Sequence, residues 1–324
     1  MANLVTKPKS QMMDSGLSFF INQLTKLDPK LYEPLYATTY MRDLKLREDI
    51  SLGNESSSYI LHTLGAGGTI SSGGLPYINS GTTALNGVDI DGQLVTTPLR
   101  PLAMSLSYSK LELMKAQQAG FSIDSSKFNA INTKYQMSAD QMAYIGDKDL
   151  SVTGMVNSTA VTNSATVTTG ATGGWSNKTP AQILTDVNEL IESVWAASGF
   201  AVCPDTLLLP PVQYGYIATQ TVSTAGTVSI LKYLEDNSIS LRVNGVSLKI
   251  LPVKWLAGAG VVSSSPADRM VAYTNDYDRI RFPMVPVQGF EPSYRDLFYS
   301  RPYVWALGQT EIVYPETIGY RDGL

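Results

Sequence analysis

The sequence predicts an α+β protein with an extended arm, a long β-hairpin, a long one-sided helix and a compact α/β core. The core is predicted by residues 179–237, which have the pattern of a helix, a buried strand and two further helical segments. The hairpin is predicted by short β-prone runs between clusters of turn residues in 56–105. The long helix is predicted by apolar residues at helical spacing over residues 124–146.

The first 55 residues are polar and favour an extended N-terminal arm. Within them, residues 17–24 (LSFFINQL) have the pattern of a short amphipathic helix, and the Asp28-Pro29 pair favours extended chain. Residues 1–48 hold seven Lys or Arg against five Asp or Glu, a balance too mild for an arm that binds nucleic acid. We expect the arm to pack against another surface.

Residues 56–105 alternate between β-prone runs and turn residues. The runs at 58–63, 88–90 and 93–98 predict a two-stranded hairpin with an irregular tip. The alternative is a flexible linker. An isolated two-stranded ribbon is marginal in water, so an ordered hairpin requires a partner surface, and we expect another copy of the chain to provide it.

Residues 106–148 are predicted to be helical. Ser109 and Glu112 have capping-box spacing at the start of a first helix, which Gly120 ends. A second helix of about 22 residues, roughly 33 Å long, follows and ends at Gly146. Its apolar residues form one stripe at helical spacing: Phe128, Ile131, Tyr135, Ala139, Met142 and Ile145. A helix that is apolar on one side covers the face of another element.

The segment before the core, residues 151–177, contains no charge and is rich in Thr and Val, which favours short strands and turns. The core helix then begins with a capping box, in which Thr179 is the cap, Pro180 takes the first position and Gln182 is three residues on. We expect its apolar stripe to be buried, in particular Ile183, Val187, Leu190, Ile191 and Val194.

Strands are predicted after this helix by short apolar runs. Residues 206–209 form a continuous apolar run, typical of a strand that is covered on both faces, and Pro210 and Pro211 end it. The later segments are predicted to be strands at 246–254, 269–273, 279–284, 303–306, 309–313 and 318–320, with a turn at 275–278.

Composition excludes several classes of function. The 324 residues suffice for two domains, and a net charge of −4 gives no overall basic surface for nucleic acid. The chain has one cysteine and one histidine, too few ligands for a Cys/His zinc site and too few thiols for an internal disulfide. No secretory signal or run of about 20 apolar residues is visible, which favours a cytosolic protein without a membrane span.

Nothing in the sequence reaches the strength of a catalytic motif, so we predict no catalytic, cofactor-binding or metal-binding residues. Cys203 is interpreted as a core residue and His62 as a surface or interface residue. Two carboxylate pairs, Asp89 with Asp91 and Asp276 with Asp278, could hold calcium or transfer protons. Turn chemistry is the favoured interpretation of both pairs.

Several segments and their order resemble the major capsid proteins of tailed bacteriophages, which have the HK97-like fold. The order is an arm, a long hairpin, a one-sided helix, a compact α/β region and returning terminal strands. The segments that carry the resemblance lie within residues 100–324 and include TPAQILTDVNELIESVW, TLLLPPVQYGYIAT, SILKYLEDN, RMVAYTNDYDRIRFPM and EIVYPETIGYRDG.

The resemblance implies a division of the chain into named parts. Residues 1–55 would be the N-terminal arm and 56–105 the extended loop. The peripheral domain would comprise 106–160 and 291–324, with a spine helix at about 124–146, and residues 161–290 would form the axial domain.

The resemblance also implies a function: a structural protein that self-assembles into pentamers and hexamers of an icosahedral phage head around packaged double-stranded DNA. The implied partners are other copies of the chain and separate scaffolding, decoration and portal proteins, with no cofactor and no membrane. The implied location is the virion capsid, assembled in the host cytoplasm.

The sequence departs from the family pattern in two respects. Some relatives join neighbours through a lysine on the extended loop, but residues 46–109 contain no lysine. Some relatives begin with a cleaved scaffolding segment, for which a hairpin near residue 56 leaves no room. Three alternatives remain: an encapsulin-like nanocompartment shell, a tail or fibre protein, and an α/β enzyme with an oligomerising arm. The enzyme would have a polar pocket near Asp276 or Asp278.

Overall fold

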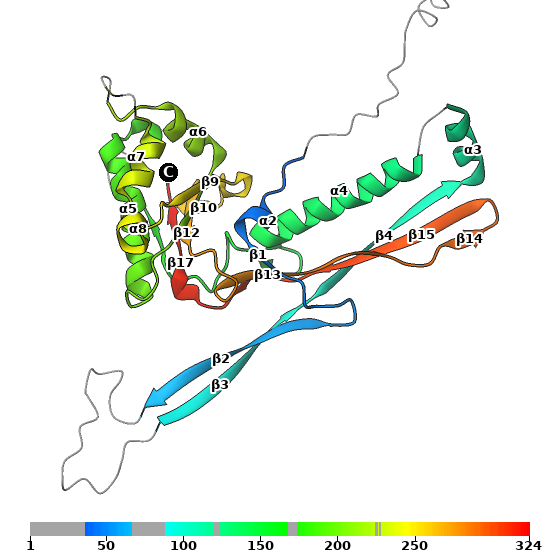
Figure 1. Ribbon diagram of the computed structural model, residues 1–324, viewed down its shortest axis with the longest axis horizontal. Helices are drawn as coiled ribbons and strands as arrows, with labels where there is room; N and C mark the ends of the chain where they lie inside the picture. The colour runs from blue at the N-terminus through cyan, green and yellow to red at the C-terminus, as the bar shows by residue number, and fades with distance from the viewer. Residues whose placement is uncertain (1–35, 67–87, 120–122, 168–173, 224–225, 227) are drawn as a thin grey trace, which may run out of the picture.

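The computed structural model describes residues 36–66, 88–119, 123–167, 174–223, 226 and 228–324. The predicted helix at 17–24 and the predicted hairpin tip lie outside these residues. Figure 1 shows a lobe of short helices around one sheet, a long ribbon of strands with one helix lying along it, and a hairpin that projects from the region where they join. None of the helices in the described part of the chain has the length and apolarity of a membrane span.

The predicted hairpin is confirmed. β2 (Ser56–Ala66) and β3 (Val88–Pro98) pair antiparallel, in a continuous register from Ser56 opposite Pro98 to Ala66 opposite Val88. In Figure 1 this ribbon extends away from both sheets.

The prediction for residues 100–109 is wrong. These residues form a strand, β4 (Arg100–Ser109), where the sequence was interpreted as the end of the loop and the start of a helix. β4 pairs antiparallel with all ten residues of β15 (Phe298–Leu307). The signal was present, because apolar residues alternate with small ones at Leu102, Met104, Leu106 and Tyr108. The helix α3 (Lys110–Ala119) begins only after Ser109.

The larger sheet has six strands and carries the long helix. Its central strand β13 (Ile280–Gly289) pairs with β15, with β16 (Glu311–Ile312) and, in parallel, with β1 (Lys45–Arg47), while β14 (Ser293–Arg295) pairs with β15. The helix α4 (Ile123–Tyr144) lies along this ribbon (Figure 1).

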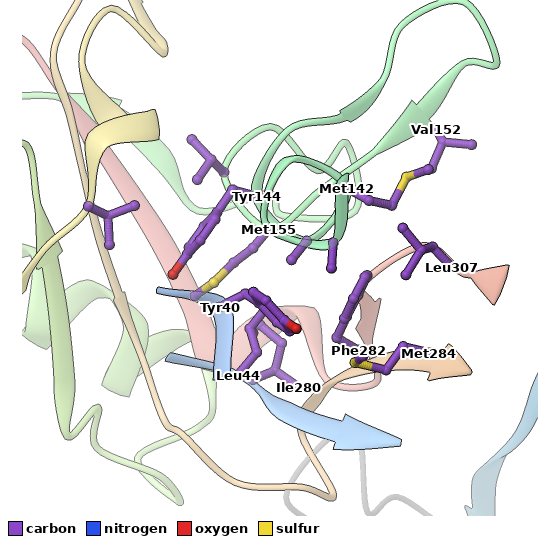
Figure 2. Close-up of a cluster of buried hydrophobic side chains, with 14 of the residues drawn as sticks. Tyr40, Leu44, Met142, Tyr144, Val152, Met155, Ile280, Phe282, Met284 and Leu307 are labelled. Atoms are coloured by element: carbon purple, nitrogen blue, oxygen red, sulfur yellow. The ribbon is translucent and has the colours of Figure 1, made fainter. Parts of the chain in front are cut away.

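The predicted stripe of α4 faces the sheet. Ile131, Tyr135, Ala139 and Met142 are buried, and their cluster includes sheet residues such as Phe282 and Leu307 (Figure 2). Phe128 is 39% exposed, although its ring lies 5.5 Å from that of Tyr303. The apolar stripe of α4 is therefore more completely buried near the C-terminal end of the helix than at Phe128.

The smaller sheet has five strands in the order β7-β17-β12-β8-β9. These are β7 (Ser164–Thr166), β17 (Ile318–Asp322), β12 (Arg269–Tyr273), β8 (Thr206–Leu209) and β9 (Lys249–Pro252). The lobe also contains α5 (Pro180–Ala197), α6 (Pro211–Thr219), α7 (Ile230–Asn237) and α8 (Ile239–Asn244).

The sequence interpretation of α5 is confirmed in detail. Thr179 and Gln182 form the reciprocal capping box, and Pro180 is the first helical residue. The five stripe residues predicted to be buried are all fully inaccessible to solvent. They pack in one cluster with Leu207 and Leu209 of β8.

The remaining elements are short. They are α2 (Tyr40–Asp43), β5 (Gly146–Asp147), β6 (Val152–Thr153), β10 (Gly260–Val262), β11 (Ser265–Ala267), and the 3₁₀ helices η1 (Trp175–Asn177), η2 (Lys254–Leu256) and η3 (Pro315–Thr317).

The two sheets do not divide the chain at residue 290. β13 ends at Gly289 but belongs to the larger sheet, and β17, near the C-terminus, is inserted between β7 and β12 of the smaller one. The sequence ranges joined 291–324 to 106–160 and kept 161–290 apart, whereas β13 and β17 each lie in the sheet that these ranges did not assign to them.

The helix α2 joins the start of the described chain to α4 and to the smaller sheet. Asp140 of α4 accepts hydrogen bonds from the backbone N–H groups of Thr39 and Tyr40 at 2.8 and 3.2 Å. The carbonyl of Asp43 accepts a hydrogen bond from the Tyr273 hydroxyl of β12 at 2.5 Å. The neighbouring Arg42 donates to the Pro252 carbonyl of β9 at 2.9 Å. Residues 39–43 are therefore held between α4 and the smaller sheet.

Replacing Leu190 with alanine tests the packing of α5. Leu190 is fully buried, and its loss should lower the free energy of unfolding by about 2–5 kcal/mol because a cavity remains. The measurement is chemical denaturation. The control Glu192→Ala, on the exposed face of the same helix, should change it by less than about 0.5 kcal/mol; equal effects from both changes would contradict the assignment.

The stability of the α4 core should fall in alkali. Burial raises the pKa of Tyr135 to about 12, whereas an unfolded tyrosine loses its proton near about pH 10. The contribution of Tyr135 is therefore complete below about pH 10 and is lost as the pH rises toward 12. Tyr135→Phe should show a shallower decline of the urea midpoint between about pH 9 and 11. Tyr40 and Tyr273, whose pKa values burial also raises, retain part of the pH dependence in this variant. A decline as steep as that of the unaltered chain would contradict the prediction.

Candidate functional site

The hairpin presents an apolar face that nothing in the described chain covers. Ile60 lies opposite Leu94, and Ile90, four residues before Leu94 on β3, lies on the same face. The side chains of Ile60, Ile90 and Leu94 are 59%, 61% and 63% exposed. His62 is exposed between them, opposite Gly92. The interpretation of His62 as a surface or interface residue therefore agrees with its position.

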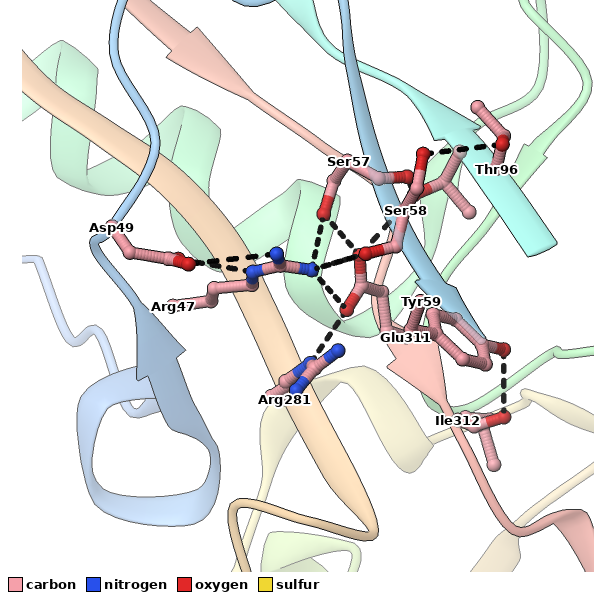
Figure 3. Close-up of polar contacts among 10 residues, drawn as sticks. Arg47, Asp49, Ser57, Ser58, Tyr59, Thr96, Arg281, Glu311 and Ile312 are labelled. Carbon is pink, nitrogen blue, oxygen red and sulfur yellow. Dashed lines mark hydrogen bonds and ion pairs between the residues drawn. The ribbon is translucent and has the colours of Figure 1, made fainter. Parts of the chain in front are cut away.

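The base of the hairpin is held by a buried carboxylate. The side chain of Glu311, on β16, is fully buried and accepts a hydrogen bond from the Arg281 Nε at 2.6 Å. It also accepts a hydrogen bond from the hydroxyl of Ser57 and one from Thr97 at 3.4 Å. Ser57 and Thr97 are cross-strand partners, so one carboxylate contacts both strands of the hairpin where they leave the body (Figure 3).

A second arginine completes this cluster. Arg47, on β1, lies 3.4 Å from the Glu311 carboxylate and donates to the Ser57 hydroxyl at 2.9 Å and to the Ser58 carbonyl at 3.1 Å. On its outer side Arg47 pairs with Asp49 at 3.0 Å, and this hydrogen bond lowers the pKa of Asp49. Two cations and one buried anion thus link the chain before the hairpin, the hairpin itself and the larger sheet (Figure 3).

The far end of the larger sheet carries a second exposed apolar region. Tyr294, Leu297 and Phe298 are exposed around the turn between β14 and β15, and Leu111 and Met114 are exposed on α3. A groove of about 430 Å³ lies between these elements. Tyr299 stacks on Tyr108 of β4 at 4.8 Å between ring centroids, so the aromatic side chains of this end are already ordered within one subunit.

A pocket lies near Asp276 and Asp278, where the enzyme alternative predicted one, but Asp276 and Ser198 in its lining hold a turn and a helix end. A cavity of about 390 Å³ is lined by Asp276, Asp278 and Ser198, among others. Asp276 pairs with Arg279 at 3.2 Å and accepts the backbone N–H of Asp278 at 3.5 Å, which is turn chemistry. The Ser198 oxygen accepts the Val202 N–H at 3.1 Å, and its hydroxyl donates to the Trp195 carbonyl at 2.8 Å. This serine caps a helix end.

The other candidate residues lie in different parts of the molecule. Cys203 is buried in the core of the smaller sheet, and burial raises the pKa of its thiol to about 11. Asp89 and Asp91 lie on β3 opposite Gly65 and Thr63, and the Asp89 carboxylate accepts the N–H of Ile90 at 2.9 Å. In the described part of the chain, no three His, Cys, Asp or Glu side chains are placed to hold a metal ion.

Sequence reasoning missed the carboxylate at the hairpin base. Glu311 and Arg281 lie in predicted strands, but no local pattern indicates that they meet. Their partner Ser57 is separated from Glu311 by 254 positions. The available signal was weak: a charged residue in the apolar run EIVY, which requires a partner if it is buried.

The family comparison and the structure comparison lead to the same kind of protein. The sequence matches the family described as major capsid protein over residues 75–324. No curated protein matches it. The fold is similar to the capsid of Myoviridae phage XM1, with a TM-score of 0.74 and 16% identity over 94% of this chain and 98% of that chain. At this identity the similarity shows the fold, and it confirms the predicted α+β, HK97-like architecture.

Two other solved structures show the same fold at lower similarity. The capsid of a native GTA particle has a TM-score of 0.60 and 12% identity over 92% of this chain and 94% of that chain. A virus-like particle from Pyrococcus furiosus has a TM-score of 0.51 and 12% identity over 96% of this chain and 98% of that chain.

Replacing Glu311 with glutamine tests the role of the cluster. The amide keeps the shape but leaves Arg47 and Arg281 without their buried counter-charge, and the free energy of unfolding should fall by about 3–5 kcal/mol. Chemical denaturation measures this loss. Hydrogen exchange should also become faster at the hairpin base.

The matched control is Asp49→Asn, which removes an exposed partner of the same Arg47. It should cost less than about 1 kcal/mol, because exposed ion pairs contribute little. If Glu311→Gln proves as mild as Asp49→Asn, the carboxylate does not hold the hairpin.

Proposed function

The chain belongs to the major capsid protein family, and we propose that its hairpin and arm complete their burial against neighbouring copies of the chain. As a member of this family it is a structural subunit of the virion capsid. The proposal adds the physical basis of assembly. Surfaces that one subunit leaves exposed become buried when copies tile a closed shell.

The observation that carries the proposal is the apolar face of the hairpin. Ile60, Ile90 and Leu94 are each more than half exposed on a two-stranded ribbon that has no core of its own. Fully burying one such side chain stabilises an assembly by about 1.5–3 kcal/mol, and each copy would bury three of these side chains. Glu311 holds both strands at the base of the ribbon, which reduces the conformational freedom that is lost when a neighbour binds it.

The two sheets suggest how a subunit is placed in a pentamer or hexamer. We assign the six-stranded sheet and α4 to the peripheral domain and the five-stranded sheet and its helices to the axial domain. This assignment differs from the limits expected from the sequence, 106–160 with 291–324 and 161–290, at β13 and β17. The axial domain would lie nearest the symmetry axis, and the hairpin would be the extended loop.

The net charge of the chain supports double-stranded DNA as the proposed contents of the shell. A net charge of −4 and a sequence pI of about 5.1 favour a wall that encloses double-stranded DNA without binding it tightly. Separate scaffolding, decoration and portal proteins would complete the head, which would assemble in the host cytoplasm. The role is mechanical, and we propose no catalytic step for it.

Electron microscopy of the purified chain tests this function directly. Closed shells are expected, and a uniform small oligomer at all concentrations would contradict the proposal. An encapsulin-like nanocompartment would give protein-filled particles, whereas the family match favours a phage head.

Leu94→Lys tests the apolar face. Leu94 is 63% exposed, so the subunit should unfold at the same denaturant concentration as the unaltered chain. Burial of the new charge against a neighbour is unfavourable, and the yield of closed particles should fall at least about tenfold.

The control for this variant is Gln93→Lys, which places the same charge on the opposite face of β3. It should assemble with the normal yield. Normal shells from Leu94→Lys would show that a neighbour does not cover this face.

A further inference from the structure

The strand β4 is paired along one edge only. β15 occupies that edge over ten residues, and no other strand in the described chain pairs with β4. One backbone contact shows which residues of β4 bond to β15. Lys110 follows the last pair of the ladder and lies opposite Leu297, and its N–H donates to the Leu297 carbonyl at 2.9 Å. In an antiparallel ladder every second residue bonds to the partner. The backbone N–H and C=O groups of Leu102, Met104 and Leu106 therefore bond to β15. The backbone groups of the residues between them point away from β15.

A second contact supports this assignment. The Ser107 carbonyl accepts a hydrogen bond from the Lys127 Nζ of α4 at 2.9 Å, which requires that this carbonyl does not face β15. Lys127 thus closes the edge at Ser107. The backbone groups of Ala103 and Ser105 remain on the open edge, where both residues are exposed.

Pro101 lies at an outward position and protects the start of this edge, but the residues after it lack the features that usually prevent strand pairing. Proteins protect such edges with charged side chains, prolines, bulges or a covering element. Residues 102–109 (LAMSLSYS) contain no charge and no proline, and the register with β15 is continuous. The outward positions carry the small side chains Ala103 and Ser105, which allow another backbone to approach closely.

We propose that the outer edge of β4 is extended by a strand from a second copy of the chain. This inference rests on the proposed function, which supplies neighbouring copies. The occupant follows from position: β3 ends at Pro98 and β4 begins at Arg100, so the open residues Ala103 and Ser105 lie close to the base of the hairpin, which we propose contacts a neighbour. Backbone pairing would then set the register between subunits, while apolar burial on the hairpin supplies affinity.

A proline substitution at one residue tests the edge without altering the side-chain face. Ser105→Pro removes an outward N–H, a position at which edge strands tolerate proline. We expect a subunit with an unchanged thermal midpoint and a yield of closed particles reduced at least about tenfold. Ser105→Ala keeps the N–H and should assemble normally. Met104→Pro removes an N–H that β15 uses, and should lower the thermal midpoint of the subunit.

Hydrogen exchange on the unaltered chain gives a second readout, independent of how proline is tolerated. The amides of Ala103 and Ser105 should exchange at least about tenfold more slowly in particles than in the unassembled fraction. The amide of Met104 should be protected in both.

The outcomes separate the two proposals. If the unaltered chain forms no shells, the proposed function fails and the β4 inference fails with it. If shells form but Ala103 and Ser105 exchange as fast as in free subunits, or Ser105→Pro assembles with normal yield, only the β4 inference is overturned.

Discussion

The buried carboxylate of Glu311 is the interaction on which the shape of the subunit depends. It lies between Arg281 and Arg47 and contacts both strands of the hairpin at Ser57 and Thr97. A two-stranded ribbon has no core to orient it, so its direction must come from its base. Charge-assisted hydrogen bonds are strong and directional, and here they convert a ribbon that could swing freely into a fixed projection.

The body behind that projection is closed, while its margins are open. Around α2, Asp140 and Asp43 join α4 to the smaller sheet through contacts to Tyr40 and Tyr273, and the two large apolar clusters consist of buried side chains. The hairpin face and the edge of β4 differ from these cores, because they leave apolar side chains and backbone groups exposed for another surface to cover. A shell subunit needs this combination. Rigid cores transmit geometry between copies, and incomplete margins make assembly favourable.

Local patterns predicted the elements whose burial depends on one periodic face. The capping box at Thr179, the stripe of α5 and the stripe of α4 were all recognisable, because neighbours three and four positions apart share a helix face. β4 was missed, although its apolar residues alternate from Leu102 to Tyr108. Residues 106–108 were assigned to the helical segment, although Ser109 correctly marks the start of α3. The strand became evident only through β15, which lies about 200 positions later in the chain.

The sequence by itself determined the secondary structure of the core, the absence of a recognisable catalytic motif and the resemblance to capsid proteins, because these depend on residue type and short spacing. Tertiary structure decided which carboxylate holds the hairpin, which faces stay exposed and how β13 and β17 are divided between the sheets. The reason is physical. Burial and pairing are properties of residues that meet in space, and Glu311 meets Arg47 across 264 positions of chain, a distance over which no local pattern carries information.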